Sequence, residues 1–227
     1  AALAVLLWAA GPLETLENRT WDWRIRYHAP RSEPSDEVRL ILLDQYSLDW
    51  IEEEFGLTWP WPREVWSYIL GFCSRSEVEA VAIDVLFADP SQYGVGDDEQ
   101  LARAFEAEEN DVLAVFLSRQ ASGLSVWPEG VPLPSLIPEG LDHWRELTGG
   151  RFTFSRAVFP QEEVAENSEI LGTVQQRADS DGVYRRAPLF ALFSDIPVPG
   201  LGLAAYMAGR DRPAEAVTRG GSLFLDG

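Results

Sequence analysis

Cysteine, methionine and histidine are scarce in this chain of 227 residues, and the shortages exclude several kinds of site. The single cysteine, Cys73, excludes an intramolecular disulfide and a thiolate metal cage, because each needs a second cysteine. The two histidines, His28 and His143, lie beside no serine or cysteine nucleophile motif. The sequence also lacks a glycine-rich phosphate loop, a Gly-x-Ser-x-Gly motif and a His-Glu-x-x-His motif. We therefore expect no catalytic site and no cofactor.

Basic residues are also few. The chain has 18 Lys and Arg against 37 Asp and Glu, which gives a net charge of -19. Such a charge repels a phosphate backbone, so we expect no nucleic acid partner. With 46% apolar residues, the chain can bury one substantial core, and its length suits a single α/β domain or two small lobes.

The N-terminal segment is apolar from Ala1 to Ala10. A membrane-spanning helix needs about 20 such residues, so the run is either the end of a transmembrane helix or a segment of a core. The only methionine is Met207, and we expect the chain to begin inside a longer protein. From Leu13 to Tyr27, apolar residues recur at steps of three and four, which predicts an amphipathic entry helix.

Alternating strands and helices are predicted in the next hundred residues. The runs 38–44, 80–87 and 111–117 are short and almost continuously apolar, as in strands covered on both faces. Between them, a helix is predicted from Pro62 to Ser74, and a second begins at Asp97, whose carboxylate can cap it. This order predicts a parallel sheet with right-handed crossovers and flanking helices.

The second half of the chain is less regular. Residues 118–159 are rich in proline and glycine, which predicts a long irregular excursion with one short element near Trp144. Further elements are expected as a strand at 171–174, a turn at 179–182, a hairpin or edge strand at 184–193, a helix after Gly200 and a strand at 222–226. The last strand is expected to be cut off by the end of the chain. The fold class predicted overall is α/β, with a mostly parallel central sheet flanked by helices.

Several motifs in this order resemble the second type of CHASE domain, the cyclase- and histidine-kinase-associated sensory extracellular modules. The most specific is Trp59-Pro60-Trp61-Pro62-Arg63 before an amphipathic helix, followed by Ala82-Ile83-Asp84-Val85-Leu86-Phe87. Supporting motifs are the entry helix with Trp21-Asp22-Trp23-Arg24, the acidic helix start Asp97-Asp98, and the segment from Asp181-Gly182-Val183-Tyr184-Arg185 to Leu189.

The resemblance implies a bacterial receptor at the cell membrane. Residues 1–12 would be the remnant of a transmembrane helix, and residues 13–227 an extracytoplasmic sensory domain that the chain's end truncates. A cyclase, histidine kinase or serine/threonine kinase would form the output inside the cell. We expect an unidentified small-molecule or environmental signal, a homodimer in the receptor, and contact with the membrane through flanking helices.

The candidate ligand-binding residues centre on Asp44 and Asp84, which are expected at the carboxyl ends of parallel strands, where open α/β sheets bind ligands. They are Asp44, Trp61, Arg63, Asp84, Asp181 and Arg185. We expect Arg63 to form a structural clamp with Asp84 and leave Asp44 as a ligand contact. Asp44, Asp84 and Asp89 could alternatively bind Mg²⁺ or Ca²⁺. Two other functions remain open: a periplasmic hydrolase that uses paired carboxylates, and a module that dimerises the receptor through its entry helix without binding a ligand.

Overall fold

The computed structural model describes residues 12–29, 35–107, 110–120, 122–136, 138, 140–209, 215–219 and 222–226. The chain divides into two compact units, which we describe separately. The first unit comprises residues 1–56 and 179–183, and the second comprises residues 57–178 and 184–227. The expectation of a transmembrane remnant falls on residues 1–12, of which 1–11 lie outside the described part. No helix in that described part is both long enough and apolar enough to cross a membrane.

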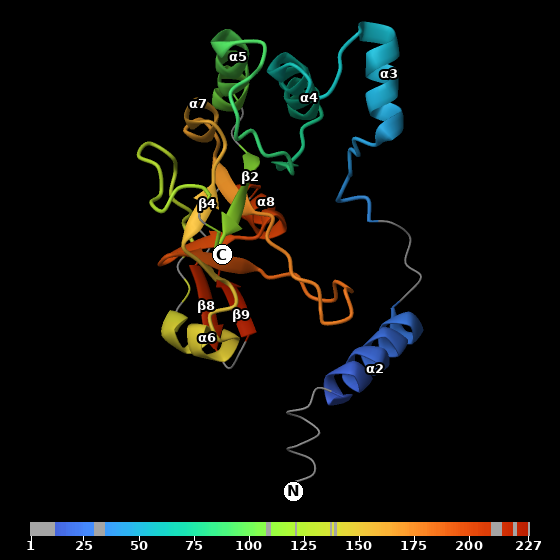
Figure 1. Ribbon diagram of the computed structural model, residues 1–227, viewed down its shortest axis with the longest axis vertical. Helices are drawn as coiled ribbons and strands as arrows, with labels where there is room; N and C mark the ends of the chain where they lie inside the picture. The colour runs from blue at the N-terminus through green and yellow to red at the C-terminus, as the bar shows by residue number, and fades with distance from the viewer. Residues whose placement is uncertain are drawn as a thin grey trace, which may run out of the picture. The chain divides into compact units, whose positions relative to one another are not determined.

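Among its described residues, the first unit contains helices α2 (Pro12–His28) and α3 (Gln45–Phe55) (Figure 1). Helix α2 covers the predicted entry helix, but its apolar stripe is exposed at Leu16, Trp23 and Tyr27. The strand predicted at 38–44 is wrong: these residues form no strand, and the apolar side chains from Val38 to Leu42 are largely exposed. A run of β-formers becomes a strand only where a partner strand satisfies its backbone groups, and this segment has no such ladder.

The second unit is built around β2 (Asp111–Ser118), whose side chains are buried at all but one position. Strands β1 (Val81–Ile83) and β5 (Ile170–Thr173) pair with it in parallel, and β4 (Arg156–Val158) pairs in antiparallel orientation with its final three residues. The predicted strands at 111–117 and 171–174 are thereby confirmed. The strand predicted at 80–87 is shorter than expected, because residues after Ile83 leave the ladder.

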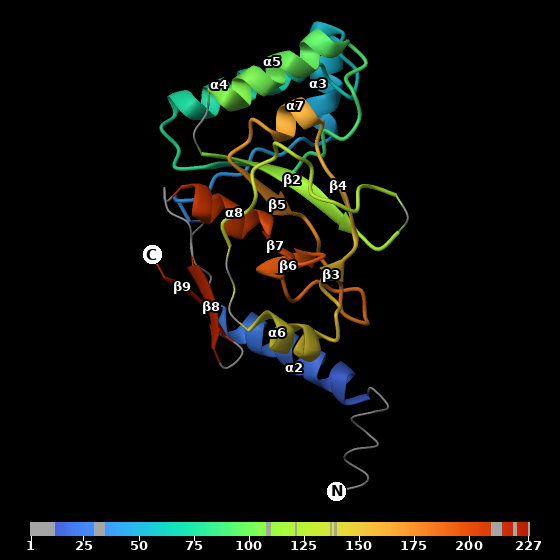
Figure 2. The same cartoon turned by 90° about the vertical axis from the view of Figure 1, so that its left-hand side faces the viewer.

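Helices lie on both faces of this sheet (Figure 2). Helices α4 (Arg63–Arg75), α5 (Val95–Glu106) and α7 (Glu162–Ala165) lie above it in that view, and α8 (Leu201–Ala208) lies below. Helix α4 confirms the helix predicted from Pro62. Its buried face carries Trp66, Leu70 and Cys73 at steps of four and three, whereas Phe72 is exposed.

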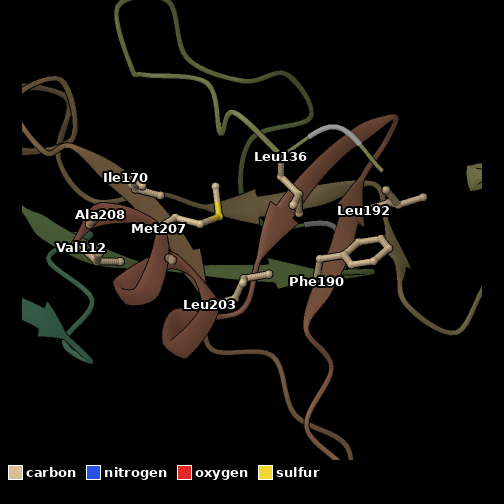
Figure 3. Packing of buried hydrophobic residues seen from close by; sticks show 9 residues of the cluster. Val112, Leu136, Ile170, Phe190, Leu192, Leu203, Met207 and Ala208 are labelled. Atoms are coloured by element: carbon tan, nitrogen blue, oxygen red, sulfur yellow. The ribbon is translucent and has the colours of Figure 1, made fainter. Parts of the chain in front are cut away.

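One part of the core lies between α8 and the sheets. Leu203 and Met207 of α8 pack with Val112 of β2 and Phe190, as Figure 3 shows. The approach of α8 to the sheet is close, because a Cβ added at Gly172 would lie 2.9 Å from the Cα of Leu201. Glycine at this position of β5 is therefore a packing requirement.

The remaining elements form a second mixed sheet and two smaller pieces. Strand β6 (Phe190–Phe193) pairs in parallel with β3 (Thr153–Phe154) and in antiparallel orientation with β7 (Ile196–Pro199). Helix α6 (Leu141–Thr148) contains Trp144, and β8 (Glu215–Arg219) pairs with β9 (Ser222–Asp226) as a hairpin. Residues 118–159, expected to be mostly irregular, thus contain α6, β3 and β4. The α/β class is confirmed, and both sheets mix parallel and antiparallel pairs.

Candidate functional site

A surface pocket of about 210 Å³ lies in the second unit, between the segment before α4 and the connection from β1 to α5. We call it the tryptophan pocket. Its lining includes Trp59, Trp61 and Trp66 from the first segment and helix α4, and Asp89 and Tyr93 from the connection. Arg63, at the first position of α4, also lines it. The sequence candidates Trp61 and Arg63 are therefore two residues of one pocket.

The tryptophans form a contacting cluster that passes from the surface to the core. Trp59 meets Trp61 edge to face with ring centroids 5.6 Å apart, and Trp66 meets Phe87 in the same way at 5.4 Å. Trp61 and Trp66 are each 4% exposed, whereas Trp59 is 49% exposed. The nearby prolines restrict the backbone, so the first two indoles are held on a stiff arm. The cluster thus supplies both core packing and an exposed aromatic surface.

Arg63 is held from two sides. Its Nε donates to Asp98 Oδ1 at 3.1 Å, and its Nη2 donates to the backbone oxygen of Asp89 at 2.8 Å. The side chains of Arg63 and Asp98 are only 10% and 9% exposed, so this ion pair is buried. The guanidinium also lies 4.7 Å from the ring centroid of Phe87, within the range of a cation–π contact. Within the described residues, no group accepts a hydrogen bond from Arg63 Nη1.

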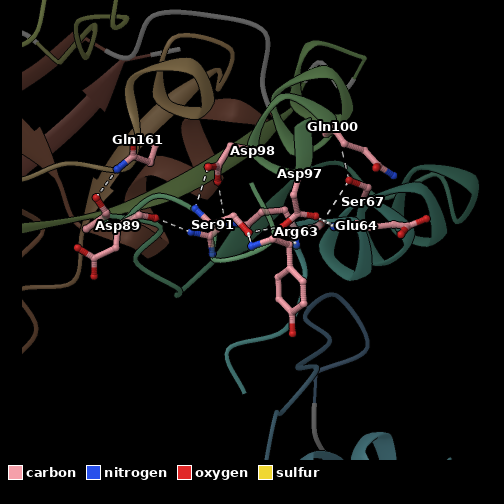
Figure 4. Close-up of polar contacts among 11 residues, drawn as sticks. Arg63, Glu64, Ser67, Asp89, Ser91, Asp97, Asp98, Gln100 and Gln161 are labelled. Atoms are coloured by element: carbon pink, nitrogen blue, oxygen red, sulfur yellow. Dashed lines mark hydrogen bonds and ion pairs between the residues drawn. The ribbon is translucent and has the colours of Figure 1, made fainter. Parts of the chain in front are cut away.

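A second carboxylate of α5 binds the start of α4 (Figure 4). Asp97 accepts from the backbone N–H groups of Arg63 at 2.7 Å and Glu64 at 3.2 Å. These donors have no partner within their own helix, and Pro62 before them supplies no side-chain cap. The prediction that Asp97 caps its own helix is wrong, because that helix begins earlier, at Val95, and the carboxylate turns to α4 instead.

The connection from β1 to α5, which forms one wall of the pocket, is hydrogen-bonded to neighbouring segments at several points along its length. Ser91 donates through its backbone N–H to Asp98 Oδ2 at 2.8 Å and through its hydroxyl to Asp97. Gln92 donates to the backbone oxygen of Pro60 at 3.2 Å. Further back, Gln161 at the start of α7 donates to the backbone oxygen of Ala88 at 2.6 Å. The wall therefore depends on both α4 and α5 for its position.

The predicted clamp between Arg63 and Asp84 is wrong, because the buried partner of Arg63 is Asp98. Asp84 follows β1 directly, is exposed and does not line the tryptophan pocket. The acidic residue of this connection that lines the pocket is Asp89, five residues later. No described residue donates a hydrogen bond to the Asp89 carboxylate, and Figure 4 shows it apart from the dashed contacts.

Three other candidates from the sequence lie elsewhere. Asp44, in the first unit, caps α3 by accepting from the Ser47 backbone N–H at 2.9 Å and hydroxyl at 2.8 Å. These bonds, the backbone one first, lower the pKa of Asp44 from 3.8. Asp181 accepts from the backbone N–H of Val183 within a turn of the first unit, as the sequence predicted for this segment. Arg185 belongs to the second unit and does not line the tryptophan pocket.

Sequence reasoning missed Asp98 as the partner of Arg63 and Tyr93 as part of the pocket wall. The available signal was the pair Asp97-Asp98, which was noted only as an acidic helix start. Two adjacent carboxylates in a first helical turn point in different directions, so one can reach a neighbouring helix while the other reaches a buried cation. The described residues contain no group of three or more acidic, histidine or cysteine side chains placed to hold a metal ion.

The second unit is an α/β domain with a small pocket lined by aromatic residues, and comparison with known proteins gives the family of the chain. The family model described as the CHASE2 domain matches residues 1–224, so the chain belongs to the CHASE2 family. CHASE2 domains are extracytoplasmic sensory modules of membrane signalling receptors and are not catalytic. No curated protein matches the chain. No solved structure matches it either.

Proposed function

We propose that this domain senses a small molecule by binding it in the tryptophan pocket. One observation carries the proposal: Trp61 lines the pocket, yet its buried Nε1–H has no acceptor among the described residues. A buried polar group without a partner costs about 1–3 kcal/mol. Native proteins satisfy most such groups, and a ligand that shifts the pocket lining enough to bring an acceptor to this N–H would recover that cost.

The contacts around the pocket support a route by which binding would become a signal. The pocket wall at Ser91 is bonded to both Asp97 and Asp98, the same carboxylates that hold the first turn of α4. A ligand that fixes the wall in one position would therefore bias the arrangement of α4 and α5. In the receptor, we propose that this shift reaches membrane helices and a cyclase, histidine kinase or serine/threonine kinase output, in a homodimer.

A compound screen by thermal unfolding tests the proposal. The 227-residue chain, its Trp59→Ala variant and its Trp50→Ala variant are screened with small molecules, and hits are confirmed by calorimetric titration. Trp50 is the matched control, since it is 46% exposed, meets Phe55 edge to face much as Trp59 meets Trp61, and does not line the pocket. Hits that stabilise the parent chain and Trp50→Ala, but not Trp59→Ala, support the proposal. Hits that stabilise Trp59→Ala as much as the parent chain contradict the proposal, and so does a screen without hits.

A second candidate function is dimerisation through α2, favoured by the exposure of the predicted apolar stripe. Leu16, Trp23 and Tyr27 are all more than half exposed, and Trp23 and Tyr27 stack at 5.7 Å on the helix surface. Apolar side chains grouped in this way are typical of an interaction surface. Sedimentation of the parent chain and of Leu16→Glu tests it: a dimer that the substitution dissociates supports the function, and a monomer at all concentrations contradicts it.

A further inference from the structure

The tryptophan pocket is lined by two residues of opposite charge, Arg63 and Asp89, whose hydrogen-bonding capacity the described residues use only in part. Arg63 uses Nε and one N–H of Nη2 within the described residues, so both N–H groups of Nη1 remain available. Asp89 contributes its backbone oxygen to Arg63, but its carboxylate makes no ion pair with it. Two residues of opposite charge therefore line the same small pocket, and the Asp89 side chain, which is exposed and makes no described contact, is free to turn its carboxylate toward a ligand there.

Neither an anion nor a cation alone matches this arrangement. Arg63 already has Asp98 as its counter-ion at 3.1 Å, and Asp97 lies against the same helical turn. A ligand with only a negative charge would add another carboxylate to this group, in a protein of net charge -19. A ligand with only a positive charge would satisfy Asp89 but would leave the donors of Arg63 without an acceptor.

Building on the proposed function, we propose that the ligand class is a small zwitterion with an apolar body. Its carboxylate accepts from Arg63 Nη1, and its ammonium group binds the Asp89 carboxylate. Both contacts are charge-assisted hydrogen bonds, which are about twice as strong as neutral ones. The ligand brings its own compensating charges, so binding adds no net charge to the acidic domain.

The walls of the pocket define the ligand's body. Trp59, Trp61 and Tyr93 line the pocket and offer aromatic surface to an apolar side chain. The volume of about 210 Å³ corresponds to roughly seven waters at about 30 Å³ each. Drug-sized ligands occupy pockets of about 300–1,000 Å³, so this one suits a smaller molecule. A free amino acid with an apolar side chain combines this size, body and charge pattern.

Calorimetric titration with matched analogues tests the ligand class. The probes are leucine and phenylalanine, their carboxamides, which lack the carboxylate, and their N-acetyl derivatives, which lack the ammonium group. Each is titrated into the parent chain, Asp89→Asn and Asp84→Asn. Asp89→Asn removes an exposed charge that makes no described contact, so folding should be preserved. Asp84→Asn is the control, because it removes an exposed carboxylate from the same connection outside the pocket.

We expect at least one free amino acid to bind the parent chain and Asp84→Asn equally, with both analogue types at least about tenfold weaker. Asp89→Asn should weaken the free amino acid about tenfold and leave the N-acetyl derivative unchanged. Equal binding of the free and N-acetylated forms overturns the ammonium contact, and equal binding of the carboxamide overturns the carboxylate contact. If neither amino acid binds while other compounds bind in a Trp59-dependent way, the zwitterion class fails and the sensing function stands. If no compound binds in a Trp59-dependent way, the zwitterion class and the sensing function are both wrong.

Discussion

Replacing Asp98 by alanine should strongly destabilise the domain, because it leaves the Arg63 guanidinium buried without a counter-ion. The pair is 3.1 Å long and about nine-tenths buried on both sides, so solvent screens it little. Removing one partner of a buried pair costs about 3–5 kcal/mol. The second carboxylate oxygen also accepts from the Ser91 N–H, which the substitution leaves unbonded. At roughly 2–4 °C per kcal/mol for a domain of this size, the melting temperature should fall by about 6–20 °C.

Urea unfolding of the parent, Asp98→Ala and Glu99→Gln measures this effect against a matched control. Glu99 is the next residue of α5, and its pair with Arg103 is exposed, with 54% and 64% of the two side chains accessible. Exposed pairs of this kind contribute about 0.3–0.5 kcal/mol. A decrease in the free energy of unfolding below about 1 kcal/mol for Asp98→Ala, or one no greater than for Glu99→Gln, would refute the stabilising role of the Arg63–Asp98 ion pair between α4 and α5.

Three further predictions follow from single contacts. Asp97→Ala should cost about 1–2 kcal/mol in urea unfolding, because it removes the cap of α4. Gly172→Ala should lower the free energy of unfolding by about 1–3 kcal/mol, since the added methyl group would lie 2.9 Å from Leu201 Cα. Gly202→Ala should raise it by about 0.5–1 kcal/mol, because a Cβ at this position of α8 meets no other atom. The pKa of Asp44 is lowered from 3.8 on folding, so its stabilisation should be complete above that value and lost as the pH falls through the lower folded pKa. Acid titration followed by NMR should show the lowered pKa, and an unshifted value would contradict the cap of α3.

The sequence predicted those elements whose signal is local. Strand β2 and helix α4 each have a pattern of apolar residues that is complete within about ten residues. The predicted bounds of both elements agree with the structure to within about one residue. The segment from Val38 to Leu42 has an equally strong strand pattern, yet it forms no ladder. Strand formation depends on a partner that the local pattern does not name, so intrinsic preference was a poor guide there.

The pocket was predicted only in part for the same reason. Trp61 and Arg63 were predicted because they stand at the start of the helix that follows the first predicted strand, where strand ends were expected to converge. The partner of Arg63 was assigned incorrectly, since choosing between Asp84 and Asp98 depends on where β1 ends. Once the strand stops at Ile83, the chain has room to pass beside Arg63 and return with α5, which brings Asp98 to the guanidinium. That path is set by tertiary packing and not by residue type.

The capping of α4 by Asp97 has a consequence for the order in which the chain is synthesised. The donor Arg63 leaves the ribosome 34 residues before the carboxylate that satisfies its backbone N–H. At about 5–20 residues per second, the start of α4 waits roughly 2–7 s for its cap. Until α5 emerges, α4 has an unsatisfied first turn and an unpaired arginine, so the two helices should become stable together as one cooperative step of folding.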